Sequence, residues 1–252
     1  MNNAIIGSHI IELKETTSTN TYTDKMLLNE KPTEGTVIIA YNQTSGKGQD
    51  QNVWESEANK NLTFSIILYP VFLNPSAQFR LLEVTALGIT DFLMQLLPSH
   101  DEIKIKWPND IYIGDRKICG TLVQNSIVGT QLSECIVGIG LNVNQEIFLS
   151  NAPNPVSLKQ ISGKDFDLQQ CLTNLLTCLN KRYIQLKNKQ FTQLESDYLS
   201  LLYRNNEWHD YIIQDNTLRG RIIGITNWGQ LKLESLDGKI YECGMKEVVY
   251  CL

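Results

Sequence analysis

The sequence predicts an α+β fold in which helices pack on a mixed β-sheet, followed by a small C-terminal β-domain. Apolar runs typical of buried strands alternate with segments whose apolar residues recur at helical spacing. After Asn205 and Asn206 the chain holds only short strand-like segments and turns. With 252 residues and 42% hydrophobic content, the chain can bury one large core and one small one.

The charge and composition argue against several classes of protein. A net charge of −5 does not favour broad DNA binding, which needs a basic face. No segment resembles a signal peptide or reaches the length of a membrane span. The six cysteines form no C-x-x-C pair and there are only three histidines, so a His-rich metal site is not expected. Buried, reduced thiols in a cytoplasmic protein are the expectation.

Two helices are predicted in the first hundred residues. Ser18 or Thr19 can cap a short helix with its apolar residues on one face. In residues 77–97 apolar side chains recur at helical spacing, and Pro98 ends that helix. Two further helices are predicted at residues 168–186 and 191–202.

The strands of the large sheet are predicted from apolar, β-branched runs. Gly114 and Asp115 indicate a tight hairpin turn between two of them. These strands are expected at residues 36–41, 62–69, 103–107, 111–113, 117–124 and 134–143.

A second, all-β domain is predicted at the C-terminus, so that the domains are residues 1–204 and 205–252. The strands are short and Asp237-Gly238 is a hairpin signal, which is typical of a small β-barrel. They are expected at residues 211–214, 219–225, 230–236, 239–243 and 247–250.

The run from Lys106 to Asp110, KWPND, is the most informative motif, and Lys117 and Gly120 follow it. Pro108 cannot donate to a sheet ladder, so a strand should end there. Asn109 and Asp110 then offer polar side chains beside the lysines. The alternative is an ordinary hairpin with solvated charges.

A polar loop at residues 43–54 separates two strands. Gly46 and Gly48 let backbone N–H groups approach an anion, Lys47 adds a charge, and Trp54 offers a flat face for a planar ring. The loop lacks the P-loop pattern, and no helix opens after it as in a dinucleotide fingerprint. The alternative is a flexible loop with a tryptophan in the core.

Two smaller motifs complete the candidate site. Ser18-Thr19-Asn20 can cap a helix and also face a polar ligand. Gly138 and Gly140 weaken an apolar strand, which indicates close approach to its backbone, a bulge or tight strand packing. Asn142 follows on the same segment.

The motifs and their order resemble those of the biotin protein ligases. The order is STN, then QTSGKG with a following Trp, then KWPNDIYIGDRKICG, and then GIGLNVN. The resemblance covers residues 13–145. It implies the catalytic-domain fold shared by class II aminoacyl-tRNA synthetases and biotin ligases, plus an SH3-like C-terminal domain. Since the chain starts at the catalytic core, it resembles the non-repressor type without an N-terminal DNA-binding domain.

The resemblance implies an ATP-dependent, C–N bond-forming ligase that uses biotin and ATP as substrates. Biotin and ATP give biotinyl-5′-AMP, and a lysine of a biotin carboxyl carrier protein then receives the biotin. The carrier would belong to acetyl-CoA carboxylase or a related carboxylase. Mg²⁺ is expected with ATP, held mainly by the phosphates, with no protein ligand assigned. The enzyme would be a cytoplasmic monomer or homodimer without DNA or membrane contacts.

Activating a carboxylate with ATP brings two anions together, so cations must stand where they meet. By resemblance, the catalytic residues are Lys117, Lys47, Lys106 and Asp110. Biotin would contact Ser18, Thr19, Asn20, Gln43, Gly46, Lys47, Lys117 and Gly120. The adenylate would contact Lys47, Gly48, Gln49, Trp54, Asn109, Lys117 and Asn142.

One residue departs from the family pattern. Many members carry arginine at the position of Gln49, so a cation is missing here. Lys47 in place of arginine keeps the charge but loses the bidentate geometry. The alternatives are a lipoate–protein ligase of the same superfamily and a non-catalytic binding protein that uses the C-terminal β-domain.

Overall fold

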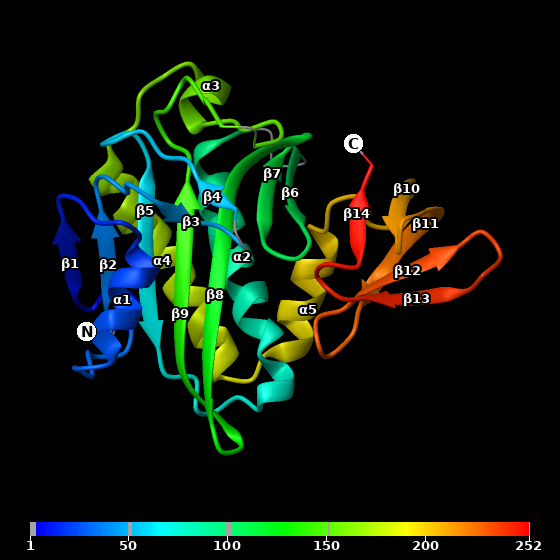
Figure 1. Cartoon of the computed structure of the whole chain (residues 1–252), viewed down its shortest axis with the longest axis horizontal. Helices are drawn as coiled ribbons and strands as arrows, with labels where there is room; N and C mark the ends of the chain where they lie inside the picture. The colour runs from blue at the N-terminus through cyan, green and yellow to red at the C-terminus, as the bar shows by residue number, and fades with distance from the viewer. Residues whose placement is uncertain (1–3, 50–51, 99–101, 151, 252) are drawn as a thin grey trace.

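The computed structural model describes residues 4–49, 52–98, 102–150 and 152–251. Its centre is a seven-stranded sheet, visible from end to end in Figure 1. The first two strands in the sheet order are parallel and all other neighbours are antiparallel, so the sheet is mixed as predicted. In order across the sheet, the strands are β1 (Ile10–Leu13), β2 (Val37–Ala40), β5 (Leu62–Leu68), β9 (Gln131–Leu141), β8 (Arg116–Val128), β7 (Asp110–Ile113) and β6 (Ile103–Lys106).

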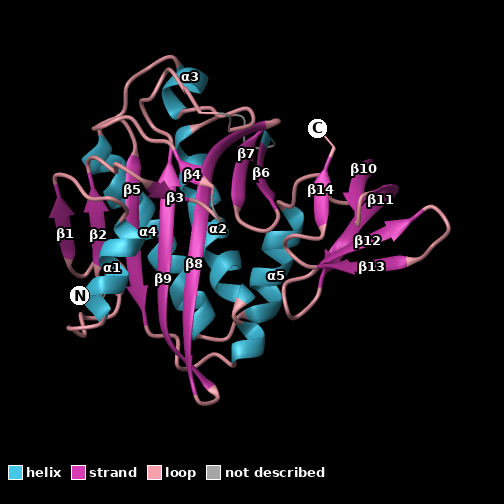
Figure 2. Ribbon diagram, in the orientation of Figure 1, coloured by secondary structure: helices cyan, strands magenta, loops and turns pink. Residues whose placement is uncertain are grey.

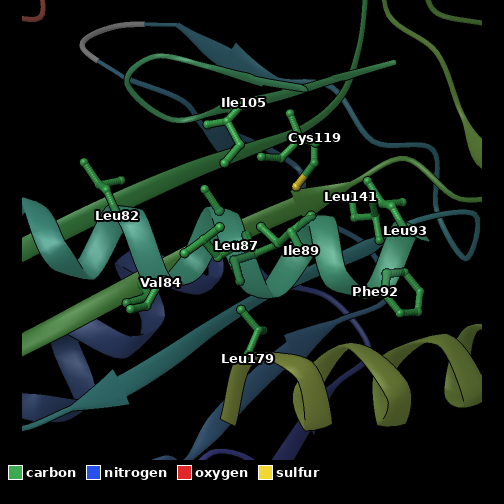
Figure 3. Close-up of a cluster of buried hydrophobic side chains, with 14 of the residues drawn as sticks. Leu82, Val84, Leu87, Ile89, Phe92, Leu93, Ile105, Cys119, Leu141 and Leu179 are labelled. Atoms are coloured by element: carbon green, nitrogen blue, oxygen red, sulfur yellow. The ribbon is translucent and has the colours of Figure 1, made fainter. Parts of the chain in front are cut away.

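Two long helices, α2 (Phe79–Leu96) and α4 (Leu168–Lys187), cover the back of the sheet in Figure 1. They cross closely at Gly88, where a Cβ atom would stand 2.8 Å from Cδ2 of Leu179. Apolar side chains of α2 fill the space between this crossing and the sheet (Figure 3). Among the described helices, the short helix α1 (Thr19–Leu27) lies on the front face.

The remaining helices lie near the ends of these elements. Helix α5 (Phe191–Ser200) packs against α2 and leads to the C-terminal sheet. Helix α3 (Leu158–Ser162) begins with a capping box between Ser157 and Gln160. A 3₁₀ turn, η1 (Pro75–Ala77), precedes α2. Within the described residues, no helix is both long and apolar enough to cross a lipid bilayer.

The C-terminal part is all β (Figure 2). Gly238 has φ +80°, as the predicted Asp-Gly hairpin requires. The five strands form an antiparallel sheet that agrees with an SH3-like domain, although no described pairing joins the edge strands into a closed barrel. In order the strands are β13 (Ile240–Cys243), β12 (Leu231–Ser235), β11 (Asn216–Ile225), β10 (Trp208–Ile213) and β14 (Val248–Tyr250).

Several short elements of the fold were not predicted, among them the turn η1. Strand β1 spans four residues and helix α3 spans five, so each is too short for a clear periodic pattern. The loop at 43–54 contains a small hairpin of β3 (Gly46–Lys47) and β4 (Val53–Trp54). Asp50 and Gln51 of that loop lie outside the described residues.

Strands β8 and β9 are longer than predicted because their hairpin runs beyond the core. Ile127 and Val128 near its tip are 51% and 70% exposed. Beyond the core the strands lose the alternating burial from which the sequence pattern is read.

Candidate active site

A cavity of about 520 Å³ lies on the front face of the large sheet, beside α1 and beneath the β3–β4 hairpin. This volume is within the usual range of small-molecule sites. Leu122 and Ile139 give its wall an apolar part. The residues predicted from the sequence that line it are Ser18, Thr19, Asn20, Gln43, Lys47, Gly48, Gln49, Trp54, Lys106, Asn109, Asp110, Lys117, Gly120 and Asn142.

Gly46 is the predicted site residue that does not line the cavity. It is buried and pairs with Trp54 in the β3–β4 hairpin. A Cβ atom at Gly46 would overlap with the carbonyl oxygen of Trp54. The glycine therefore allows the hairpin that carries Trp54, and its contact with biotin stays a prediction.

The strand register places four motif residues on one line across the sheet. Lys106 pairs with Asp110, Asp110 with Gly120, and Gly120 with Gly140. This line crosses β6, β7, β8 and β9, so it brings residues from 34 positions of the chain into one row, with residues up to 20 positions apart as direct neighbours. The turn between β6 and β7 contains Pro108 after a cis Trp107–Pro108 peptide bond, and β6 ends at Lys106, one residue before the predicted end.

A bulge in the β7–β8 pairing explains the spacing of Lys117 and Gly120. Ile111 pairs with Cys119 and the next residue, Tyr112, pairs with Lys117, so β8 has one extra residue. The extra residue brings Lys117 and Gly120 to the same face, where a Cβ atom at Gly120 would stand 3.3 Å from Lys117 Nζ. Lys117 Nζ lies 2.7 Å from Asp110 Oδ1 and forms an ion pair with it.

Trp54 lies flat against the backbone of the sheet. A Cβ atom at Gly140 would overlap with the indole ring, and one at Gly120 would stand 3.0 Å from its Cζ3 atom. Lys117 Nζ lies 5.7 Å from the ring centroid on the cavity side. Among the described residues the indole Nε1 has no hydrogen-bond partner although it is buried. The Trp54 ring thus explains one of the two glycines in β9.

Asn20 explains the other glycine. A Cβ atom at Gly138 would overlap with Asn20 Oδ1. Ser65 Oγ donates toward Asn20 Oδ1 at 2.6 Å, and Asn20 Nδ2 donates to Gln124 Oε1 at 2.9 Å. Asn20 is thereby held in one orientation on the sheet at the edge of the cavity.

The N-terminus of α1 is capped by a residue from another motif. Ser18 occupies the N-cap position, but its side chain makes no capping hydrogen bond. Instead Gln43 Oε1 accepts from the backbone N–H of Thr19 at 2.7 Å. The predicted helix is present, whereas the predicted side-chain cap by Ser18 or Thr19 is not. Because Gln43 takes over this task, Ser18 keeps its hydroxyl for the cavity.

The two asparagines differ in what they can offer a ligand. Asn109 Nδ2 donates to the carbonyl of Thr121 at 2.5 Å, and the Thr121 hydroxyl donates back to the Asn109 carbonyl at 3.1 Å. Asn142 Nδ2 donates to Val156 at 3.0 Å, but its Oδ1 is buried without a hydrogen-bond partner in the described structure. Asn142 therefore adds to the cavity lining a residue with a buried acceptor that no described group satisfies.

Three lysines give the cavity its positive charge. Lys47 is exposed on the hairpin, Lys117 is partly buried and Lys106 lies deeper. Burial lowers the pKa of Lys106, and nearby Lys117 and Arg204 lower it further, while Asp110 opposes them. Lys106 Nζ donates to the hydroxyl of Tyr112 at 3.1 Å.

Glu55 was not predicted as a site residue. Its carboxylate accepts from the backbone N–H groups of Leu149 at 2.7 Å and Ser150 at 2.8 Å, which ties the hairpin to the loop on the other side of the cavity. Burial would raise the pKa of Glu55, but these hydrogen bonds outweigh it and the pKa is lowered. No local sequence pattern marks a residue whose partners lie about 95 positions away.

Comparisons with known proteins give one consistent result. A family model described as the biotin/lipoate A/B protein ligase family matches residues 12–142. The "Bifunctional ligase/repressor BirA" of Bacillus spizizenii is 30% identical, over 96% of this chain and 75% of that protein. The "Biotin--[acetyl-CoA-carboxylase] ligase" of Mycobacterium tuberculosis is 28% identical, over 66% of this chain and 60% of that protein.

A solved structure resembles nearly the whole chain. The biotin protein ligase of Aquifex aeolicus, in complex with biotin and ATP, superposes with a TM-score of 0.79 and 26% identity. The superposition covers 96% of this chain and 98% of that one. The likeness therefore includes the C-terminal sheet as well as the part matched by the family model.

Proposed function

The chain belongs to the biotin/lipoate A/B protein ligase family, and we propose that it is a biotin protein ligase. It joins biotin to ATP, releases pyrophosphate, and transfers biotin from biotinyl-5′-AMP to a lysine of a carrier protein. One observation carries the proposal: the Lys117–Asp110 ion pair lies beside the backbone of Gly120, in a cavity that is also lined by two more lysines. The names of the relatives and the ligands of the Aquifex enzyme support it.

The first half-reaction needs positive charge at one point. An oxygen of the biotin carboxylate attacks the α-phosphorus of ATP, and the bond to the bridging oxygen of the leaving pyrophosphate breaks. Both partners are anions, so fixed cations lower the barrier, and one well-placed donor can contribute roughly 2.7–4 kcal/mol. We assign Lys117 to the point where the two meet, with Lys47 on the hairpin and Lys106 on β6 as further cations, because all three line the cavity.

The polar end of the cavity suits the ureido ring of biotin. Ser18, Thr19 and Asn20 are each no more than 5% exposed, and Gln43 lies beside them. Asn20 and Gln43 Oε1 are already paired within the protein, and the Ser18 hydroxyl and the Gln43 amide NH₂ are the groups that a ureido ring can bond, whereas the apolar dithiolane ring of lipoate offers them no partner. Sites built to bond a polar substrate reject an analogue that lacks the polar group. This arrangement favours biotin over lipoate.

The opposite side of the cavity suits the nucleotide. Trp54, Gly48, Gln49 and Asn142 line the cavity, and the buried Asn142 Oδ1 has no hydrogen-bond partner in the described residues. No group of three or more His, Cys, Asp or Glu side chains in the described residues could hold a metal ion. Mg²⁺ would arrive with ATP, held mainly by phosphate oxygens and water, with no protein ligand assigned.

In the second half-reaction a lysine amine of the carrier attacks the carbonyl of the mixed anhydride. The C–O bond to the phosphate breaks, AMP leaves with that oxygen, and the amine gives up a proton. Asp110 is the carboxylate that lines this cavity at the ion pair, and it orients the amine or accepts its proton. The carrier is the biotin carboxyl carrier protein of acetyl-CoA carboxylase or a related enzyme, which the name of the Mycobacterium relative supports.

The proposal extends to the cellular location and the oligomeric state of the ligase. All six cysteines are free thiols and five of them are buried, which suits a reducing cytoplasm. The ligase would act there as a monomer or homodimer.

ATP–pyrophosphate exchange with Mg²⁺ tests the first half-reaction, with biotin or lipoate in parallel assays. We expect exchange that requires biotin and falls at least ~100-fold in Lys117→Ala. Lys159→Ala is the control, because that lysine pairs with Glu146 and Asp165 outside the cavity lining. Exchange with lipoate alone, or with neither acid, would overturn the proposal.

A further inference from the structure

The C-terminal sheet contacts the KWPND motif at two points. The indole Nε1 of Trp107 donates to the carbonyl of Gly229 at 2.9 Å. The ammonium of Lys106 lies 5.0 Å from the ring centroid of Tyr250 in β14. Lys106 and Tyr250 are therefore neighbours although they come from different sheets.

Lys106 lies between two aromatic rings at the wall of the cavity. Its Nζ atom stands 4.8 Å from the ring centroid of Tyr112 and donates to the Tyr112 hydroxyl at 3.1 Å. The ring of Tyr250 contacts it from the C-terminal sheet. Removing an ammonium from water is costly, and the negative faces of two rings offset part of that cost. Both rings also restrict where the ammonium can lie.

Tyr250 is itself firmly held. Its ring meets Tyr211 edge to face at 5.3 Å and lies 6.2 Å from Tyr203. The following residue, Cys251, accepts a hydrogen bond from Arg204 at 2.8 Å. A ring fixed in this way can fix the charge beside it, whereas a mobile ring could not.

The Tyr250 hydroxyl does not take part in this contact. It is buried and has no hydrogen-bond partner in the part of the chain that the structure describes. The interaction with Lys106 therefore uses the face of the ring. Tyr250→Phe should keep the contact, and this makes it the matched conservative variant.

On the basis of the proposed function, we infer that Tyr250 is a positioning residue that holds the Lys106 ammonium at the cavity for adenylate formation. The C-terminal sheet then completes the active site from outside the catalytic domain. Tyr250 acts through Lys106 and does not itself line the cavity. The electrostatic character of the ring face, rather than its bulk, is the property that matters.

The first test changes the ring electronics and keeps the ring shape. Tyr250 is replaced by phenylalanine or by pentafluorophenylalanine in the full chain, and kcat/KM for ATP is measured by pyrophosphate exchange with biotin. We expect Tyr250→Phe to stay within about twofold of wild type. The fluorinated ring, whose face no longer attracts a cation, should lower kcat/KM roughly two- to thirtyfold. Equal values for the two rings would overturn the inference.

The second test is a double-mutant cycle of Tyr250→Leu and Lys106→Met. We expect Tyr250→Leu to lower kcat/KM for ATP in the wild-type background and to change it less than twofold beside Lys106→Met. The same fold loss in both backgrounds would show that Tyr250 acts only through packing, and would overturn the inference.

Urea unfolding of the same four proteins checks the contact without any activity. If the two substitutions are additive in unfolding free energy, the Lys106–Tyr250 contact is absent and the inference fails. A wild-type protein that gives no biotin-dependent exchange would instead refute the proposed function, and the unfolding cycle would still decide the contact.

Discussion

The ammonium of Lys117 lies 2.7 Å from Oδ1 of Asp110, on neighbouring strands of the large sheet. About a quarter of each side chain is exposed, at 24% and 21%, so both can still reach a substrate. The β7–β8 bulge sets this relationship, because it turns Lys117 to the face of Gly120. Asp110 thereby holds the cation in place before the anionic substrates arrive.

Replacing Asp110 should separate the two half-reactions. Asp110→Asn keeps the shape of the side chain but cannot accept a proton. We expect transfer from preformed biotinyl-AMP to the carrier protein to fall on the order of 100-fold, and pyrophosphate exchange to fall less than about tenfold. Single-turnover transfer assays give the first rate. Asp24→Asn, at an exposed position on α1, is the control. If exchange falls more than transfer, Asp110 serves adenylation instead.

The glycine beneath Trp54 should be essential for the position of the ring. In Gly140→Ala the new Cβ atom overlaps with the indole, so the ring must shift away from the sheet. We expect a loss of about 1–3 kcal/mol in unfolding free energy and more than ~10-fold in exchange activity. Gly220→Ala is the matched control, because its Cβ atom meets only ordinary contacts of 3.6 Å in another strand. Equal effects of the two variants would contradict the ring placement.

The missing cation at position 49 should weaken the hold on the adenylate. Gln49 lines the cavity, so an arginine there can reach a phosphate. We expect Gln49→Arg to slow the release of biotinyl-AMP roughly three- to tenfold, measured by filter binding after mixing with unlabelled ligand. Gln131→Arg adds the same charge at an exposed position of β9. An unchanged release rate in Gln49→Arg would refute this role.

Glu83 should make stability depend on pH. Burial raises its pKa to about 7, against the opposing effect of Arg80. The folded protein therefore binds this proton more tightly than the unfolded chain, whose glutamate has a pKa near 4.5. This contribution to stability is fully present below pH 4.5 and is lost as the pH rises to about 7.

The unfolding free energy lost over this pH range is on the order of 3 kcal/mol, and Glu83→Gln should abolish this pH dependence. The measurement is urea unfolding of both proteins at pH 5, 6 and 7.5. We expect the unfolding free energy of Glu83→Gln to increase relative to that of wild type at each higher pH. Curves that stay parallel would show that Glu83 ionises normally.

Much of the fold was open to prediction because its signals are local. Apolar alternation and helical spacing predicted α1, α2, α4, α5 and most strands to within a few residues. Short elements escaped, since a five-residue helix such as α3 carries too little periodic pattern. The C-terminal end of the chain was correctly predicted to be all β, because a hairpin signal such as Asp237-Gly238 depends on only two residues.

The sequence by itself determined which residues can form the candidate site, because motif order, charge and glycine content are properties of short segments. Only the tertiary structure decided how they meet. The register aligned Lys106, Asp110, Gly120 and Gly140, and the bulge brought Lys117 to the same face. The roles of Glu55 and Tyr250 became visible only there, because a hydrogen bond across 95 positions or a ring contact across 144 leaves no local pattern.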